Sequence, residues 1–113
     1  MRQRIPRRHV DARHRHTRQT LRAEQAKALG EGGCDAISLE TFTDLEESKI
    51  ALRAVKDTTQ LPCSCLMAFV FKMKTPFGVG PQKAVRGLEA AGADVIGANC
   101  TTPHWTAKVI ERM

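Results

Sequence analysis

The sequence has 113 residues, enough for one domain with a modest core, since a chain of this size buries only about 65% of its unfolded surface. Hydrophobic residues make up 42% and charged residues 27%, which is ordinary for a globular protein. No run approaches the roughly 18 consecutive apolar residues that cross a bilayer, so a membrane-spanning protein is not expected. The aromatic content of 4% disfavours a surface that stacks single-stranded nucleic acid.

The formal net charge of +6 is concentrated at the N-terminus. Residues 1–30 carry nine Lys and Arg against two Asp and Glu, a net of +7, whereas residues 31–113 carry nine against ten, a net of −1. Residues 1–22 hold eight Arg and three His with few apolar residues, and such a pattern predicts a disordered basic arm. We therefore divide the chain into this arm and a domain over residues 23–113. The arm is either a solvated tail or a segment that contacts phosphates.

From residue 23 the pattern alternates between helix and strand signals. Residues 23–29 are predicted to be helical and to stop at the glycines that begin with Gly30. Residues 34–40 predict a short strand. Thr43 and Glu46 fit a capping box, which predicts a helix over residues 44–57. Its apolar face is expected to comprise Ile50, Ala51, Ala54 and Val55.

The second half of the chain repeats this alternation. Residues 61–70 are almost continuously apolar, which is typical of a strand covered on both faces. A loop over residues 71–80 leads to a helix that begins at Pro81 and closes at Gly92. Residues 94–100 predict a third strand. A last helix is expected after a Thr102–Pro103 cap, with its inward side formed by Trp105, Val109, Ile110 and Met113.

An α-β-α-β-α-β-α order requires parallel strands joined by helical crossovers. An internal repeat supports this interpretation, because residues 29–37 (LGEGGCDAI) align with residues 88–96 (LEAAGADVI) at an offset of 59 residues, about two β/α units. The predicted fold class is therefore α/β, a partial (β/α)8 TIM-type barrel with about three parallel strands.

Reactive groups in such a sheet gather at the C-terminal ends of the strands. Glu40 and Cys100 both follow strands and are expected on the same rim, although they lie 60 residues apart in sequence. A carboxylate at the end of an apolar strand is a candidate for function; otherwise it is a solvated loop residue or the partner of a lysine. Cys100 precedes a capped helix, where a thiolate is favoured, although free cysteines are often buried small hydrophobes.

The remaining cysteines have a simpler interpretation. Cys63 and Cys65 lie two apart in a strand and share a face, but two ligands do not complete a tetrahedral metal site, so core packing is expected for them and for Cys34. His104 is expected to be exposed. No signal-peptide pattern precedes these cysteines, which predicts reduced thiols and a cytoplasmic location.

Two stretches carry the resemblance of this sequence to a known family. Residues 33–49 (GCDAISLETFTDLEESK) and residues 92–100 (GADVIGANC) resemble the homocysteine S-methyltransferase family, most closely the homocysteine-binding module of cobalamin-dependent methionine synthase. Residues 77–81 with Ala84 and Val85 fit the loop and helix that precede the second stretch. The resemblance covers residues 23–100, and the two stretches together are more specific than either alone.

The resemblance implies a zinc-containing (β/α)8 barrel that methylates the sulfur of homocysteine to give methionine. In that family three Cys thiolates hold Zn²⁺ and the substrate sulfur completes the tetrahedron, so that a thiolate exists at neutral pH. Cys100 corresponds to the first metal ligand. Glu40 and Asn99 fall at substrate-binding positions, with Glu40 meeting the amino acid portion. Methylcobalamin, betaine and S-methylmethionine all serve as methyl donors in the family, and the present residues do not select one.

The sequence also departs from the family pattern. The paired cysteines that supply the other two ligands, and the early strands of the barrel, are not among these residues. Leu66 and Ala68 stand where small hydroxyl residues are usual, and residues 101–105 (TTPHW) replace a glycine-rich continuation. We therefore expect the chain to need partners, namely the missing barrel segments or a cobalamin or folate module of a longer parent, and to be inactive alone, with no catalytic residue of its own.

Two further hypotheses come from other classes. The domain could be an inert scaffold for an Arg-rich arm that binds nucleic acid through phosphates, with a strong salt dependence. It could also be a barrel enzyme for a phosphorylated metabolite, held where Gly78 to Pro81 precede a helix N-terminus.

Overall fold

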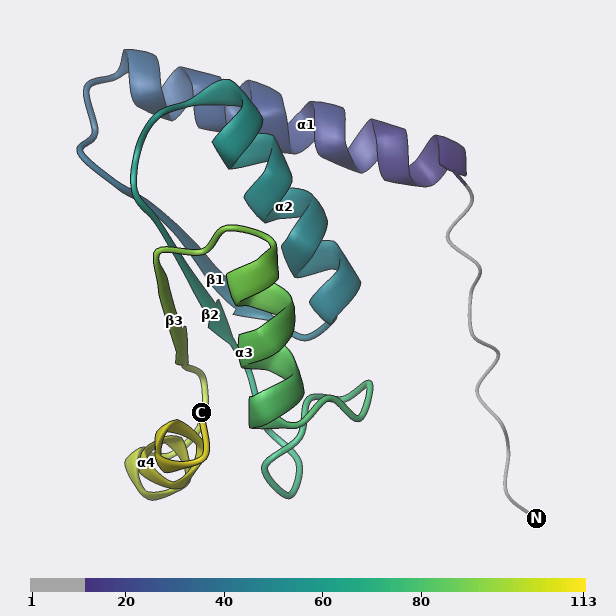
Figure 1. The fold of residues 1–113 in the computed structure, drawn as a ribbon, viewed down its shortest axis with the longest axis vertical. Helices are drawn as coiled ribbons and strands as arrows, with labels where there is room; N and C mark the ends of the chain where they lie inside the picture. The colour runs from purple at the N-terminus through teal and green to yellow at the C-terminus, as the bar shows by residue number, and fades with distance from the viewer. Residues whose placement is uncertain (1–11) are drawn as a thin grey trace.

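The computed structural model describes residues 12–113, which form helices and strands that alternate around one parallel sheet (Figure 1). The strand order is β1-β2-β3, and both pairings are parallel. This confirms the α/β class and the three-stranded parallel sheet of a partial barrel. The elements are α1 (Ala12–Glu31), β1 (Ile37–Phe42), α2 (Leu45–Thr58), β2 (Cys63–Met67), α3 (Pro81–Ala90), β3 (Val95–Ala98) and α4 (Pro103–Glu111).

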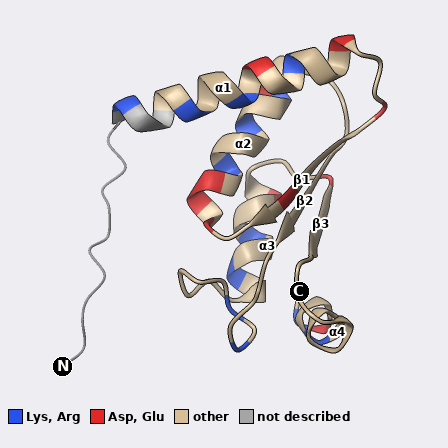
Figure 2. Cartoon of the chain, turned by 180° about the vertical axis from the view of Figure 1, so that it is seen from behind, with Lys and Arg blue, Asp and Glu red and all other residues tan. Residues whose placement is uncertain are grey.

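Helix α1 is longer than predicted, because it begins at Ala12 rather than at residue 23. The prediction of a disordered arm is therefore wrong for residues 12–22, while residues 1–11 lie outside the described residues. The guanidinium groups of Arg18 and Arg22 lie 3.8 and 3.5 Å from the carboxylate of Glu47 in α2, and Arg22 also lies 5.3 Å from the centre of the Phe42 ring. Figure 2 shows the basic residues spaced along α1 and the acidic first turn of α2. These contacts offset the repulsion between arginines that favours disorder in isolation.

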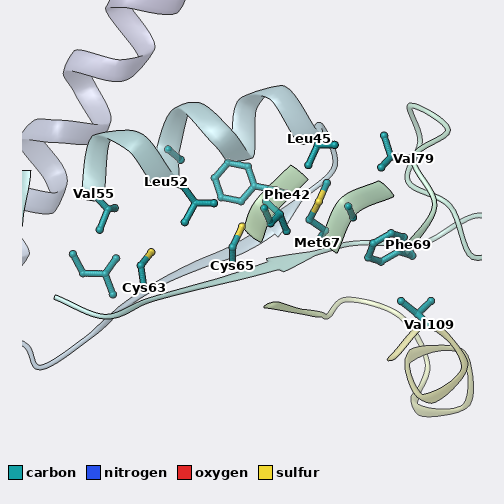
Figure 3. Close-up of a cluster of buried hydrophobic side chains, with 14 of the residues drawn as sticks. Phe42, Leu45, Leu52, Val55, Cys63, Cys65, Met67, Phe69, Val79 and Val109 are labelled. Carbon is teal, nitrogen blue, oxygen red and sulfur yellow. The ribbon is translucent and has the colours of Figure 1, made fainter. Parts of the chain in front are cut away.

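The core lies between the sheet and its helices. Cys63, Cys65 and Met67 on β2 are fully buried and point toward α2, where Leu52 and Val55 are buried as well (Figure 3). Three alternate positions of one strand thus meet one helix face, as the period of a strand dictates.

A glycine allows α3 to pack closely on α2. A Cβ added at Gly87 would lie 3.0 Å from Cδ2 of Leu45, which is tighter than most side-chain contacts and would require Leu45 to shift. The small residue on α3 therefore determines how near the two helices come.

The opposite face of the sheet is much less covered. Ser38 and Glu40 are exposed, Ser64 and Leu66 are half-buried, and Val95 is 59% exposed. The expectation that residues 61–70 form a strand covered on both faces is therefore wrong: the strand is shorter and burial alternates along it. In a closed barrel this face would be the packed interior.

Several local boundaries also differ from the predictions. The N-cap of α2 is Asp44 rather than Thr43, and its side chain accepts a hydrogen bond of 2.9 Å from the Glu46 N–H. Ile50 is only half-buried, whereas Leu52 is completely buried. A helix wheel locates an apolar stripe but not its centre, which depends on how the helix rolls against the sheet.

Helix α4 buries less than expected. Only Val109 is fully buried, near Phe69 at the end of β2 (Figure 3), while Trp105 and Ile110 are 43% and 46% exposed. Their predicted inward position is wrong, because α4 packs mainly against β3 among the described elements and leaves these two side chains exposed.

Asp94 connects the N-terminal ends of β2 and β3. Its carboxylate accepts hydrogen bonds from the Lys56 ammonium and, at 2.8 Å, from the Cys63 N–H. These two hydrogen bonds hold the pKa of Asp94 below its usual value, and the bond from Lys56 has the larger effect. The stabilisation is therefore present at neutral pH and is lost as the pH falls through the lowered pKa.

Within residues 12–113, no helix combines the length and the apolar character that crossing a membrane requires.

Candidate functional site at the C-terminal rim of the sheet

The ends of β1 and β3 meet across β2. Thr41 Oγ1 lies 3.5 Å from Cys100 Sγ and accepts a hydrogen bond of 3.0 Å from Asn99 Nδ2. Glu40 is the neighbour of Thr41 in β1. The expectation that residues 40 and 100 share one rim of a parallel sheet is thus confirmed, and the polar residues of both strand ends converge there.

A bulge in β1 directs these side chains. Leu39 pairs with Cys65 and Phe42 pairs with Met67, so β1 has one residue more than β2 between these two pairs. Glu40 and Thr41 occupy this irregular stretch, and Thr41 has a positive φ of 63°. Such a conformation is rare for a β-branched residue, and bulges beside active sites are known to redirect side chains.

A chain of hydroxyl groups holds the Glu40 carboxylate on the open face of the sheet. Ser64 Oγ donates to Ser38 Oγ at 3.0 Å, and Ser38 Oγ donates to Glu40 Oε1 at 3.0 Å. Ser38 and Ser64 are register partners on neighbouring strands, which brings their side chains together on one face. The carboxylate is therefore fixed in direction and remains exposed, as a contact for a cationic group requires.

Thr41 is the functional candidate that sequence reasoning missed. The internal repeat could have indicated it, because the offset of 59 residues, continued along both strands, aligns Glu40 with Asn99 and Thr41 with Cys100. The structure confirms that the positions are equivalent: Thr41 and Cys100 have φ values of 63° and 58°. Residues from alternate strands of a barrel share a layer, which explains why these two meet across β2.

The other sulfur atoms lie away from this rim. Cys63 and Cys65 are fully buried under α2, which confirms their role in core packing. Burial raises the pKa of both thiols, that of Cys65 to about 12. They are therefore neutral thiols at physiological pH. Cys34 is half-buried beside the core, and Cys100 is exposed.

The donor set does not complete a zinc site within the described residues. In residues 12–113 no three His, Cys, Asp or Glu side chains come together in a way that could hold a metal ion. His104 is exposed, as expected, and its ring contacts the edge of Trp105 at 5.5 Å between centroids. Cys100 is thus the single thiol that this part of the chain presents at the rim, and a tetrahedral zinc site needs further ligands.

A groove of about 280 Å³ follows the free edge of β1 beneath α1. Arg22, Glu47, Glu40 and Thr41 are among its lining residues, but Asn99 and Cys100 are not. Because the edge of β1 that faces the groove carries no neighbouring strand among residues 12–113, its backbone groups are available for pairing.

The two alternative hypotheses gain little here. Arg18 and Arg22, predicted as part of the basic arm, form ion pairs with Glu47. The Glu47 carboxylate offsets part of the positive charge that would attract phosphates. Pro81 is the first residue of α3, as predicted, and Gly80 is its N-cap, but a helix start alone does not define a phosphate site.

We expect the cysteines to differ strongly in reactivity. Brief treatment of the folded chain with iodoacetamide, followed by peptide mass spectrometry, should label Cys100 about tenfold or more faster than Cys63 and Cys65, because a buried neutral thiol reacts only when the protein opens. In urea the difference should vanish. Equal labelling of Cys63 and Cys100 in the folded chain would contradict the described packing.

Parallel β/α units with polar residues gathered at the strand ends are compatible with part of a (β/α)8 barrel. The sequence profile of the homocysteine S-methyltransferase family matches residues 8–113. The chain therefore belongs to the homocysteine S-methyltransferase family, which is a family of methyltransferases. A comparison with curated proteins found no match.

Proposed function

We propose that this chain forms the homocysteine-contacting rim of a homocysteine S-methyltransferase domain, in which a methyl group is transferred to the homocysteine thiolate to give methionine. The observation that carries the proposal is that Thr41, Asn99 and Cys100 contact one another at one end of a parallel sheet, next to Glu40 in β1, in a chain that belongs to this family. The Glu40 carboxylate would contact the ammonium group of the substrate, and Asn99 would contact the substrate beside Cys100.

The physical basis is the match between these groups and an amino acid that carries a thiol. An exposed carboxylate, held by Ser38, suits an ammonium group. The Asn99 Oδ1 atom is shielded from solvent and has no hydrogen-bond partner among the described residues, and unsatisfied buried acceptors of this kind occur at functional sites.

Cys100 is proposed as the one metal ligand that the described residues supply. The other ligands of a zinc site would come from outside residues 12–113. The free edges of β1 and β3 are the places where further barrel strands would pair, so we propose the remaining barrel segments as partners. A cobalamin or folate module would provide the methyl group if methylcobalamin is the donor.

The test is a titration of the full chain with L-homocysteine, in which the NMR chemical shifts of the backbone amides at the rim measure binding. We expect Glu40→Gln to weaken binding about two- to fivefold, which is the range for an exposed ion pair. The analogue 4-mercaptobutanoate, which lacks the ammonium group, should bind the variant and the original chain equally. Glu89→Gln on α3, also at an exposed carboxylate, should change neither affinity.

Shifts confined to residues away from the rim would contradict the proposal. An equal loss of affinity for both compounds in Glu40→Gln would remove Glu40 from the ammonium contact, because the analogue has no ammonium to lose.

A further inference from the structure

The side chain of Thr41 contacts both Asn99 and Cys100. Asn99 Nδ2 donates to Thr41 Oγ1 at 3.0 Å, so an amide hydrogen already occupies one lone pair of the hydroxyl oxygen. The remaining close neighbour of that oxygen is Cys100 Sγ at 3.5 Å, a distance within range for a hydrogen bond to sulfur. Either the Thr41 hydroxyl or the Cys100 thiol can be the donor in this contact, and the three side chains form a connected series from Asn99 through Thr41 to Cys100.

We propose that Thr41 is a positioning residue that holds the Cys100 sulfur in a single orientation at the rim, and that Asn99 fixes the direction of the Thr41 hydroxyl. This inference rests on the proposed function in taking Cys100 as the functional sulfur. It adds that Thr41 orients this sulfur directly and that Asn99 does so through Thr41.

The backbone supports the assignment. Thr41 and Cys100 both have left-handed φ values, a conformation that is unfavourable for residues other than glycine. A strained pair persists only where the surroundings determine it, and the two strained residues here touch each other through their side chains. The backbone strain is therefore located at Cys100 and at the residue that contacts its sulfur.

The experiment compares Thr41→Val with Thr41→Ser by NMR of the full chain without added ligand. Valine keeps the β-branched shape, and therefore the backbone strain, but lacks the hydroxyl group. In the original chain and in Thr41→Ser we expect χ1 couplings of Cys100 that report one rotamer, and one Asn99 side-chain amide proton shifted by its hydrogen bond. Thr41→Val should lose both signatures and show averaged couplings at Cys100.

Asn99→Asp tests the direction of the series. An ionised carboxylate only accepts hydrogen bonds, so the Thr41 hydroxyl should turn toward Asp and leave the sulfur, and Cys100 should then lose its single rotamer although Thr41 is present. This variant also keeps the inference testable if Thr41→Val fails to fold. Thr58→Val, at the C-terminal end of α2, is the matched control and should leave the Cys100 couplings unchanged.

Persistence of one Cys100 rotamer in Thr41→Val would overturn the positioning role of Thr41. Averaging in Thr41→Ser as well would show that the hydroxyl is not responsible, and persistence in Asn99→Asp would overturn the role of Asn99. These spectra involve neither homocysteine nor metal, so their outcome is independent of the homocysteine-binding test.

Discussion

Leu52→Ala is expected to remove about 2–5 kcal/mol from the free energy of unfolding. Leu52 is completely buried between α2 and the sheet, and truncation of such a side chain loses its transfer free energy and leaves a cavity (Figure 3). Small domains are stable by only about 5–15 kcal/mol, and this sheet is covered well on one face only. The variant should therefore unfold at a clearly lower urea concentration than the original chain.

Urea denaturation followed by circular dichroism measures the effect. Leu21→Ala is the matched control, since it makes the same change on α1 at a side chain that is 59% exposed, and it should alter stability by less than about 0.5 kcal/mol. Similar losses in the two variants would contradict the described core. Leu52→Met should retain most of the stability, because methionine nearly conserves the volume.

The chain alone is expected to form no methionine above the blank when supplied with Zn²⁺, L-homocysteine and S-methylmethionine or methylcobalamin. Residues 12–113 bring no three metal-binding side chains together, and Cys63 and Cys65 are neutral thiols under α2. One thiol at the rim leaves a tetrahedral zinc site incomplete, so zinc should bind weakly and without selectivity.

Mass spectrometry of the reaction mixture measures methionine directly. The control is Cys100→Ala, which should give the same blank value as the original chain. Turnover by the original chain that disappears in Cys100→Ala would refute the expectation, and it would show that this chain completes a working site through Cys100.

The sequence predicted the alternation of elements and the common rim because both depend on local patterns. Apolar runs separated by helical stretches require parallel crossovers, and parallel strands bring their C-terminal ends to one edge. Glu40 and Cys100 could be placed together on this basis without any knowledge of contacts.

Interactions between distant residues account for what was missed. Residues 12–22 continue helix α1, where Arg18 and Arg22 meet Glu47 on another helix, and no local pattern in an arginine-rich segment shows that partner. The centre of the apolar face of α2 moved to Leu52 for a similar reason, since the packing angle against the sheet decides it.

The order of the helices and strands, the family, and the identity of the polar residues at the strand ends were determined by the sequence alone, because hydrophobic period, turn chemistry and residue type are local properties. The tertiary structure alone decided that Thr41 touches Cys100, that Asn99 donates to Thr41, and that Cys63 and Cys65 face away from the rim. These facts depend on the register between strands and on a bulge of one residue, and shifting a strand by a single position turns every side chain to the other face.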